Sequence, residues 1–306
     1  MCMKQQRLSA FFLSLCGVLI WFLTDSVRLR QAAVEALALC AGSVIPALFP
    51  FLAVSGLLIA LGFGQWAAPL LSGLMTPLFR LPGIAGSALL LGLVGGYPIG
   101  AQTAADLYRN GRLTRDETAR LLSFCNNSNP VFLISVLGAG VFGSVHRGIW
   151  LWLIHLLSAL LTGLLLRGRN PVCRRSTLPR VISAAPSFAA AFVTAVRSAA
   201  MGMLSVCAFV VLFYVLASPL KQIGGPPAAV AVGFLELFSL TPMLTNDPFS
   251  FILAAAMSGW GGLSVLSQTA AVLEGTGLPL RSCLAGKALQ GCLSALLALA
   301  AVGFLF

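Results

Sequence analysis

Long apolar segments that can cross a lipid bilayer are the feature that most constrains this chain. A spanning helix needs about 20 mostly apolar residues, and four segments meet this requirement without interruption: residues 8–24, 44–62, 149–166 and 201–218. Two further apolar segments contain polar residues, 114–142 and 280–306. Only 9% of the residues are charged, whereas a soluble domain has about 25%. We therefore expect an all-α polytopic membrane protein with about six crossing helices.

The charges predict an orientation rather than a nucleic-acid partner. The formal net charge is +11, and cytoplasmic loops of membrane proteins collect Lys and Arg. With the N-terminus inside, most of these residues fall on the same side, which predicts that both termini are cytosolic. The eight cysteines form no CxxC pair and lie mostly in apolar runs, so we interpret them as small buried residues. No metal, cofactor or enzymatic motif is indicated.

Two other segments are broken by glycines near their middle. Residues 84–110 are interrupted at Gly95-Gly96-Tyr97-Pro98, and residues 249–275 at Gly259-Trp260-Gly261-Gly262. Each arm is long enough to cross only about half of a bilayer at a rise of about 1.5 Å per residue. The breaks therefore predict two re-entrant helical hairpins.

The two broken segments are similar to each other. Gly95-Gly96 aligns with Gly261-Gly262, and Gln102-Thr-Ala-Ala105 with Gln268-Thr-Ala-Ala271. If the chain crosses the membrane an odd number of times between equivalent points of the two broken segments, the second segment is inverted relative to the first. Residues 27–43 and 187–200 mix charges with apolar residues at helical spacing, which is typical of interfacial helices. The predicted domains are an N-terminal transmembrane helix (1–26), a first repeat with a broken helix at 114–142 (27–167), a charged cytosolic linker (168–186) and an inverted second repeat (187–306).

The breaks also predict a binding site, because lipid cannot satisfy the N–H and C=O groups of non-helical backbone. Inverted repeats with broken helices are typical of secondary transporters, which bind substrate near the midplane. Helices are expected to restart at Pro98, at Asn129-Pro130 and at Ser264, and such N-termini favour a carboxylate or a phosphate. The candidate substrate-binding residues are Gly95, Gly96, Tyr97, Pro98, Asn126, Asn127, Ser128, Asn129, Gly261, Gly262, Ser264 and Lys287.

Several of these side chains have two interpretations. Lys287 lies two turns into the last helix, where it either contacts an anionic substrate or extends to the headgroups. Tyr97 and Trp260 either stack on an aromatic ligand or anchor the chain at the interface. Glu236, an acid inside an apolar run, either couples a proton or cation or pairs with a neighbour such as Lys287. His155 is interpreted as a structural histidine.

Five motifs together resemble a known family. They are residues 45–51 (IPALFPF), 95–101 (GGYPIGA), 121–130 (LLSFCNNSNP), 233–236 (GFLE) and 262–268 (GLSVLSQ). The pattern is similar to that of YlbJ-type sporulation integral membrane proteins, also called stage V sporulation protein V. That family carries the nucleoside-recognition gate domain shared with concentrative nucleoside transporters and a ferrous-iron transporter. In related nucleoside carriers the substrate lies between hairpin tips and unwound helices, which correspond here to residues 95–98, 126–130, 259–262 and the surroundings of Lys287.

The resemblance implies a transporter of dipicolinate across the outer forespore membrane of a sporulating bacterium. Dipicolinate is a planar aromatic dianion, which suits helix N-termini, a lysine and asparagines. The alternatives are a nucleoside or other organic-anion transporter of the same fold, and a non-transporting sporulation scaffold. The expected partners are the bilayer and the small anionic substrate, with a second copy or other sporulation membrane proteins as further candidates and no nucleic acid.

Overall fold

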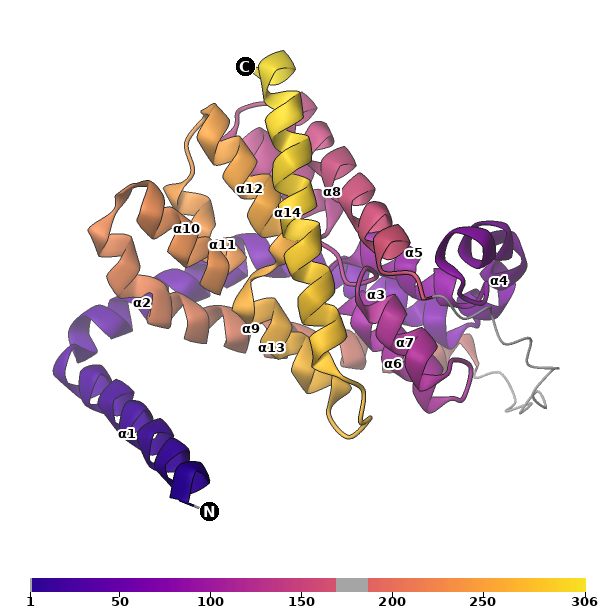
Figure 1. The fold of residues 1–306 in the computed structure, drawn as a ribbon, viewed down its shortest axis with the longest axis horizontal. Coiled ribbons are helices and arrows are strands. Elements are labelled where there is room, and N and C mark those ends of the chain that lie inside the picture. Colours follow the sequence, from indigo (N-terminus) through magenta and orange to yellow (C-terminus); the bar gives the residue numbers. More distant parts are fainter. Residues whose placement is uncertain (1, 169–186) are drawn as a thin grey trace.

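The structure is a computed structural model that describes residues 2–168 and 187–306, with side chains from residue 9 onward. The predicted charged linker, 168–186, lies outside the described residues except for Gly168. The described residues form helices and loops without a strand (Figure 1). Five helical segments are long and apolar enough to cross a membrane: 26–60, 145–165, 188–223, 248–273 and 280–305. The predicted all-α polytopic fold is confirmed.

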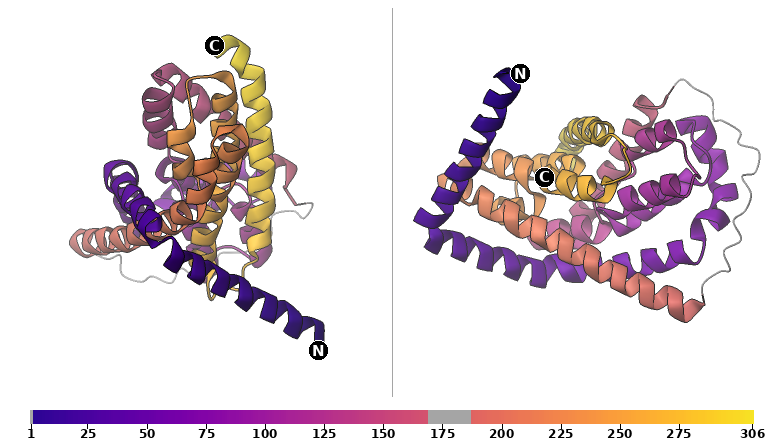
Figure 2. Two further views of the ribbon diagram at one scale, coloured as in Figure 1. Left: turned by 90° about the vertical axis from the view of Figure 1, so that its left-hand side faces the viewer. Right: turned by 90° about the horizontal axis from the view of Figure 1, so that it is seen from below.

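Two long helices pack against each other along one side of the molecule (Figure 2). The first is continuous through α2 (Ser26–Leu39), the π-helical turn η1 (Cys40–Val44) and α3 (Ile45–Ala60). The second is α9 (Phe188–Ile223). Gly56 lies against Ala195, and the Tyr214 hydroxyl donates a hydrogen bond to Glu35, so the two helices are antiparallel.

The segments expected to form interfacial helices, 27–43 and 187–200, are therefore not separate helices. Neither segment ends at a helix-breaking residue, and each continues directly into the following apolar segment. Pro46 follows the wider turn η1, which accommodates a residue without an N–H while the helix continues. The apolar helix α1 (Cys2–Thr24) projects from the start of α2 (Figure 1).

A second group of helices packs around α14 (Leu280–Leu305). Both α8 (Val145–Leu165) and α12 (Pro248–Trp260) run antiparallel to it. The hydroxyls of Ser158 and Ser294 lie 2.8 Å apart where α8 meets α14. Gly259 and Gly291 bring α12 and α14 close together, because a Cβ at Gly259 would lie only 2.9 Å from the Cα of Gly291.

The first predicted hairpin is present. Helices α5 (Ala85–Gly95) and α6 (Ile99–Arg109) pack along each other and turn at Gly96-Tyr97-Pro98. Gly96 has a φ of 86°, a left-handed value that favours glycine.

The expected second hairpin, at 249–275, is not formed. Helix α13 (Gly262–Leu273) continues end to end from α12 and packs against α6 and α9 rather than back on α12 (Figure 1). Gly261 and Gly262, with φ values of 87° and 88°, kink the chain without reversing it. The reason is tertiary: α12 packs along α14 and also contacts α8 and α10, so these helices occupy the surface of α12 on which α13 would have to fold back.

The second broken segment is consequently not inverted relative to the first. At one end of the molecule Arg109 donates to the Val272 carbonyl at 2.9 Å, and Arg115 donates to the Gly277 carbonyl at 2.9 Å. The segments that follow the two glycine breaks therefore run side by side in the same direction. At the opposite end Arg147 donates to the Leu305 carbonyl at 3.0 Å. If the arginine-rich end is cytosolic, the C-terminus lies on the other side, which contradicts the expectation that both termini share one side.

The start of α7 (Arg115–Leu122) is stabilised by the acids that follow Thr114. The Thr114 hydroxyl accepts a hydrogen bond from the Glu117 N–H at 3.2 Å, and the Thr114 N–H donates to the Glu117 carboxylate at 2.7 Å. This capping box satisfies two N–H groups at the helix start.

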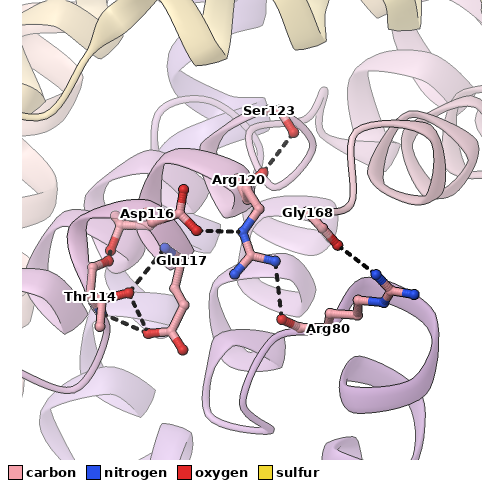
Figure 3. A network of polar contacts seen from close by, with 8 residues as sticks. Arg80, Thr114, Asp116, Glu117, Arg120, Ser123 and Gly168 are labelled. Carbon is pink, nitrogen blue, oxygen red and sulfur yellow. Dashed lines mark hydrogen bonds and ion pairs between the residues drawn. The ribbon is translucent and has the colours of Figure 1, made fainter. Parts of the chain in front are cut away.

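Arg120 ties α7 to two other segments at the arginine-rich end (Figure 3). Its guanidinium pairs with Asp116 at 3.2 Å and donates to the Arg80 carbonyl at 3.2 Å. Arg80 in turn donates to the Gly168 carbonyl at 3.0 Å. The base of the hairpin, the start of α7 and the chain after α8 are thereby held together.

Asp247 caps α12 at the opposite end, and its replacement by Ala should lower stability. Its carboxylate accepts hydrogen bonds from the Thr245 hydroxyl and from the Ser250 N–H, and these bonds hold the pKa of Asp247 below its usual range. We expect Asp247→Ala to cost about 1 kcal/mol, measured as a lower thermal unfolding midpoint in detergent, whereas Asp247→Asn retains most of the cap. Because the folded-state pKa is lowered, the difference should be full at neutral pH and shrink below about pH 4.

Candidate functional site

Four interruptions of helical structure meet inside the described structure. They are the hairpin turn at 96–98, the coil at 123–129 between α7 and the π-helix η3 (Phe132–Val141), the break between α10 (Gly225–Leu235) and α11 (Leu237–Leu240), and the kink at Gly261. A Cβ at Gly96 would lie 2.9 Å from that of Asn129. One at Gly262 would lie 3.0 Å from the Leu235 carbonyl, and one at Gly261 would lie 3.4 Å from Tyr97.

The asparagines of the first break hold the surrounding elements together. The Asn129 amide donates to the Val94 carbonyl at the hairpin tip at 2.9 Å, while its oxygen accepts the Val131 N–H at 2.7 Å. The predicted cap at Asn129 is therefore confirmed. Asn126 donates to the Thr269 hydroxyl of α13 at 2.9 Å. The break is thus bonded both to the hairpin and to α13.

Lys287 lies at the centre of this arrangement and is 1% exposed. Its ammonium nitrogen contacts the Gln290 side-chain oxygen at 2.8 Å and the Asn126 main-chain carbonyl at 3.0 Å. The Tyr97 hydroxyl is 3.5 Å away, and the Tyr97 ring centroid is 5.0 Å away. All of these partners are neutral. The interpretation of Lys287 as a side chain that extends to the headgroups is wrong, because the side chain is buried and its nitrogen contacts the hairpin tip, the asparagine break and Gln290 of its own helix.

The hydrogen-bond network continues from Lys287 towards α8. Gln290 donates to the Asn127 side-chain oxygen at 2.9 Å, and the Ser128 N–H donates to His155 Nε2 at 3.0 Å. His155 is buried and supports the break, which agrees with its interpretation as a structural histidine. Sequence reasoning did not place Gln290 in the site, although a Gln one turn after Lys287 in an apolar helix is a usable signal.

Three buried polar atoms of this network have no hydrogen-bond partner among the described residues: Asn126 Oδ1, His155 Nδ1 and Ser258 Oγ. Asn126 belongs to the break and is bonded to α13 through its amide nitrogen. His155 is bonded to the break, and Ser258 to the hairpin tip, through another of their atoms. Unpaired buried groups of this kind are rare in native proteins and mark places for water, ions or ligands.

Two other predicted residues have different roles from those expected. Ser264 does not cap α13: the helix begins at Gly262, and the Ser264 hydroxyl instead lies 3.4 Å from the Gln268 amide nitrogen. Trp260 is buried, stacks on Phe234 with ring centroids 4.9 Å apart and donates to the Phe234 carbonyl, so it packs α12 against α10.

Pro98 and Gly95 take part in the hairpin turn itself. Pro98 precedes α6 as its N-cap residue rather than as its first helical residue. Gly95 is the last residue of α5, and a Cβ there would lie 2.3 Å from the Ile99 side chain. The Tyr97 hydroxyl donates to the Ser258 carbonyl at 2.6 Å, which fastens the tip to α12.

Glu236 forms part of a separate cluster. It caps α11 through its carboxylate, which accepts the Ser239 N–H, and it interacts electrostatically with Lys221 of α9. Lys221 lies 3.1 Å from the Tyr214 ring centroid. No contact joins Glu236 to Lys287 in the part of the chain that the structure describes.

The cavity beside the hairpin tip is nearly closed. It is lined by Tyr97, Ser128, Asn129, Phe238 and Gln268, among others, and has a volume of about 10 Å³. That space is comparable to one water molecule. A ligand of the size of an aromatic acid therefore requires movement of the surrounding elements.

In the described ranges no group of three His, Cys, Asp or Glu side chains is placed to bind a metal.

Comparison with known proteins agrees with this architecture. Residues 41–147 match the Gate family, described as nucleoside recognition. This region contains α3, the hairpin and the asparagine break. The chain is also 29% identical over 330 aligned residues to the sporulation integral membrane protein YlbJ of Bacillus subtilis (strain 168), with 94% of this chain and 80% of that protein covered. The chain is thus similar to YlbJ over most of its length.

The likeness to YlbJ extends beyond the Gate region, because the alignment covers 94% of the chain whereas the Gate match covers residues 41–147. The predicted resemblance is confirmed. No solved structure matches the chain.

Proposed function

We propose that the protein is a membrane carrier for a small aromatic dicarboxylate, dipicolinate, which binds near Lys287 where the helix breaks meet. The observation that carries this proposal is a fully buried lysine whose contacts are all neutral oxygens or a ring. A charge inside a membrane protein needs a partner or water. An anionic substrate is the partner that this site lacks.

The surroundings of the site suit a planar ring with polar substituents. The small cavity, which Lys287 itself does not line but which shares Tyr97 with its surroundings, is lined by the aromatic side chains of Tyr97, Phe132 and Phe238, together with Ser128 and Asn129. Aromatic side chains bind a flat ring by stacking or edge contacts, and a serine hydroxyl is a hydrogen-bond donor for a carboxylate. These features favour an aromatic acid over an aliphatic one.

The helix breaks provide the movement that transport requires. Because the cavity holds little more than a water molecule in this conformation, substrate enters only when the hairpin tip and α11 separate. Gly96, Gly261 and Gly262 have positive φ values and form natural hinges at the tips of these elements. Alternating exposure of such a site is the usual mechanism of a secondary transporter.

The relationship to YlbJ supports a role in sporulation, and we propose the outer forespore membrane as the location. Transport from the mother cell would then supply dipicolinate to the developing spore. The match to a nucleoside-recognition family favours a second candidate, a nucleoside carrier with the same fold.

Uptake into proteoliposomes distinguishes these functions. We expect protein-dependent entry of labelled dipicolinate and little entry of uridine, because a neutral nucleoside leaves Lys287 without a charge partner. Uridine uptake without dipicolinate uptake would favour the nucleoside carrier. If neither dipicolinate nor uridine enters the liposomes although the protein is folded and correctly inserted, the result would contradict transport and favour a scaffold.

A further inference from the structure

The hydrogen bonds of Lys287 match a neutral amine better than an ammonium. A neutral amine has two N–H donors, and two carbonyl-type acceptors lie at hydrogen-bond distance, the Gln290 side chain at 2.8 Å and the Asn126 main chain at 3.0 Å. The third contact, to the Tyr97 hydroxyl oxygen, is longer at 3.5 Å, beyond the usual range of a strong hydrogen bond. An ammonium would therefore have one N–H without a good acceptor.

No carboxylate faces Lys287 from the elements packed around it. Helices α7, α8, α12 and α13 all contact α14, and the Tyr97 hydroxyl of the hairpin tip also reaches Lys287. The titratable groups that interact with Lys287 are Tyr97, Cys125, His155 and Cys283. None of these is an acid that is ionised at neutral pH when buried.

The empty carrier would hold an isolated charge inside the protein if Lys287 were protonated. Burial of an unpaired ammonium is costly, and the cost disappears when a carboxylate occupies the site. Protonation of the amine and binding of the anion therefore favour each other.

We propose that Lys287 takes up one proton when the anionic substrate binds and releases it when the substrate leaves, so that each transported anion is accompanied by a proton. This inference rests on the proposed function, since it assigns the coupling ion to the same site. The proton comes from water and forms a bond to the Nζ lone pair. The resulting ammonium donates its third hydrogen to the substrate carboxylate, and the reverse step returns the proton to water on the other side.

Other groups are less suited to hold this proton. His155 already accepts the Ser128 N–H at Nε2, so a second proton on its ring would break that bond. Glu236, which the sequence suggested as a coupling residue, interacts with Lys221 and caps α11. These two residues provide the comparison variants.

Calorimetry in several buffers measures the proton directly. Dipicolinate is titrated into the purified protein at about pH 8, where its carboxyls are ionised, in buffers with different ionisation enthalpies. The slope of the observed enthalpy against the buffer enthalpy gives the number of protons taken up, and we expect about one. A slope of zero with clear binding overturns the inference and leaves the proposed function intact. Absence of binding refutes both, and a fluorescence unfolding scan verifies that the protein is folded.

Two variants locate the proton. His155→Gln keeps an acceptor for the Ser128 N–H but cannot be protonated, and Glu236→Gln keeps a capping oxygen; both should retain uptake of about one proton. Lys287→Arg carries a permanent charge and should bind without proton uptake. Loss of uptake in either of the first two variants, or continued uptake in Lys287→Arg, would assign the proton to another group or to the ligand itself. If Lys287→Arg does not bind, loss of uptake in either of the first two variants still overturns the inference, and retained uptake excludes His155 and Glu236 as the site of the proton.

Discussion

Replacement of Lys287 by Met should weaken dipicolinate binding by about 100-fold, because loss of one member of a buried charge pair costs about 2–5 kcal/mol. Methionine has a similar unbranched shape and fills the same space without a charge. The variant also leaves the Asn126 carbonyl and the Gln290 side chain without their donor. The dissociation constant can be measured by equilibrium dialysis with labelled dipicolinate.

Lys221→Met is the matched control for this substitution. Lys221 is also a lysine inside a helix of the membrane region, but it packs on Tyr214 and interacts with Glu236 rather than with the asparagine break. We expect dipicolinate affinity to change by less than about threefold in the control. Equal losses in both variants would mean that general positive charge, not the site at Lys287, attracts the anion.

Much of the site was predictable because its residues are unusual for their surroundings. Asn126 to Asn129 and Lys287 are polar residues in apolar segments, and such residues in membrane proteins are retained only where protein or water satisfies them. Gly95-Gly96 and Gly261-Gly262 interrupt helices that otherwise continue. Local sequence therefore indicated where helices break and which polar groups are buried, and the structure places these groups together.

The direction of the chain after a break was not predictable in the same way. Gly96 and Gly261 both have positive φ values, yet the first lies at a reversal and the second at a kink. The difference arises from packing between distant segments: α5 packs on α6, whereas α12 packs on α14. Similar sequences at the two breaks thus gave an incorrect second hairpin and an incorrect inversion.

Residues that act through their position in space were also missed. Ser258 belongs to the site because its carbonyl accepts the Tyr97 hydroxyl from a segment more than half the chain away. Thr269 contributes because Asn126 reaches it from the first repeat. Ser258 carried no signal in the sequence, because serine is not unusual in a membrane helix. Thr269 stood out only as part of the repeated Gln-Thr-Ala-Ala block, which did not indicate its contact with Asn126.

Replacement of Gly100 by Ala should disrupt the site through backbone contact alone. A Cβ at Gly100 would lie 1.9 Å from the Cys125 carbonyl oxygen, and one at Gly92 would lie 1.8 Å from the same atom. This carbonyl sits between α5 and α6, directly before Asn126. The added methyl group would overlap the Cys125 carbonyl, and neither α6 nor this carbonyl can move without its neighbours. The asparagine break must therefore shift away from the hairpin. Overpacking typically costs about 1–3 kcal/mol, and we expect a lower unfolding midpoint together with at least about tenfold weaker dipicolinate binding.

Gly202→Ala tests whether this effect is specific to the contact. Gly202 lies in the interior of α9, and a Cβ there would meet no atom within 4 Å. Alanine is the better helix former by up to about 1 kcal/mol, so this variant should be as stable as the unchanged protein or more stable, with unaltered binding. If Gly100→Ala also retained stability and affinity, the break at Cys125 would not need its close approach to the hairpin. The position of the asparagines would then depend on their hydrogen bonds alone.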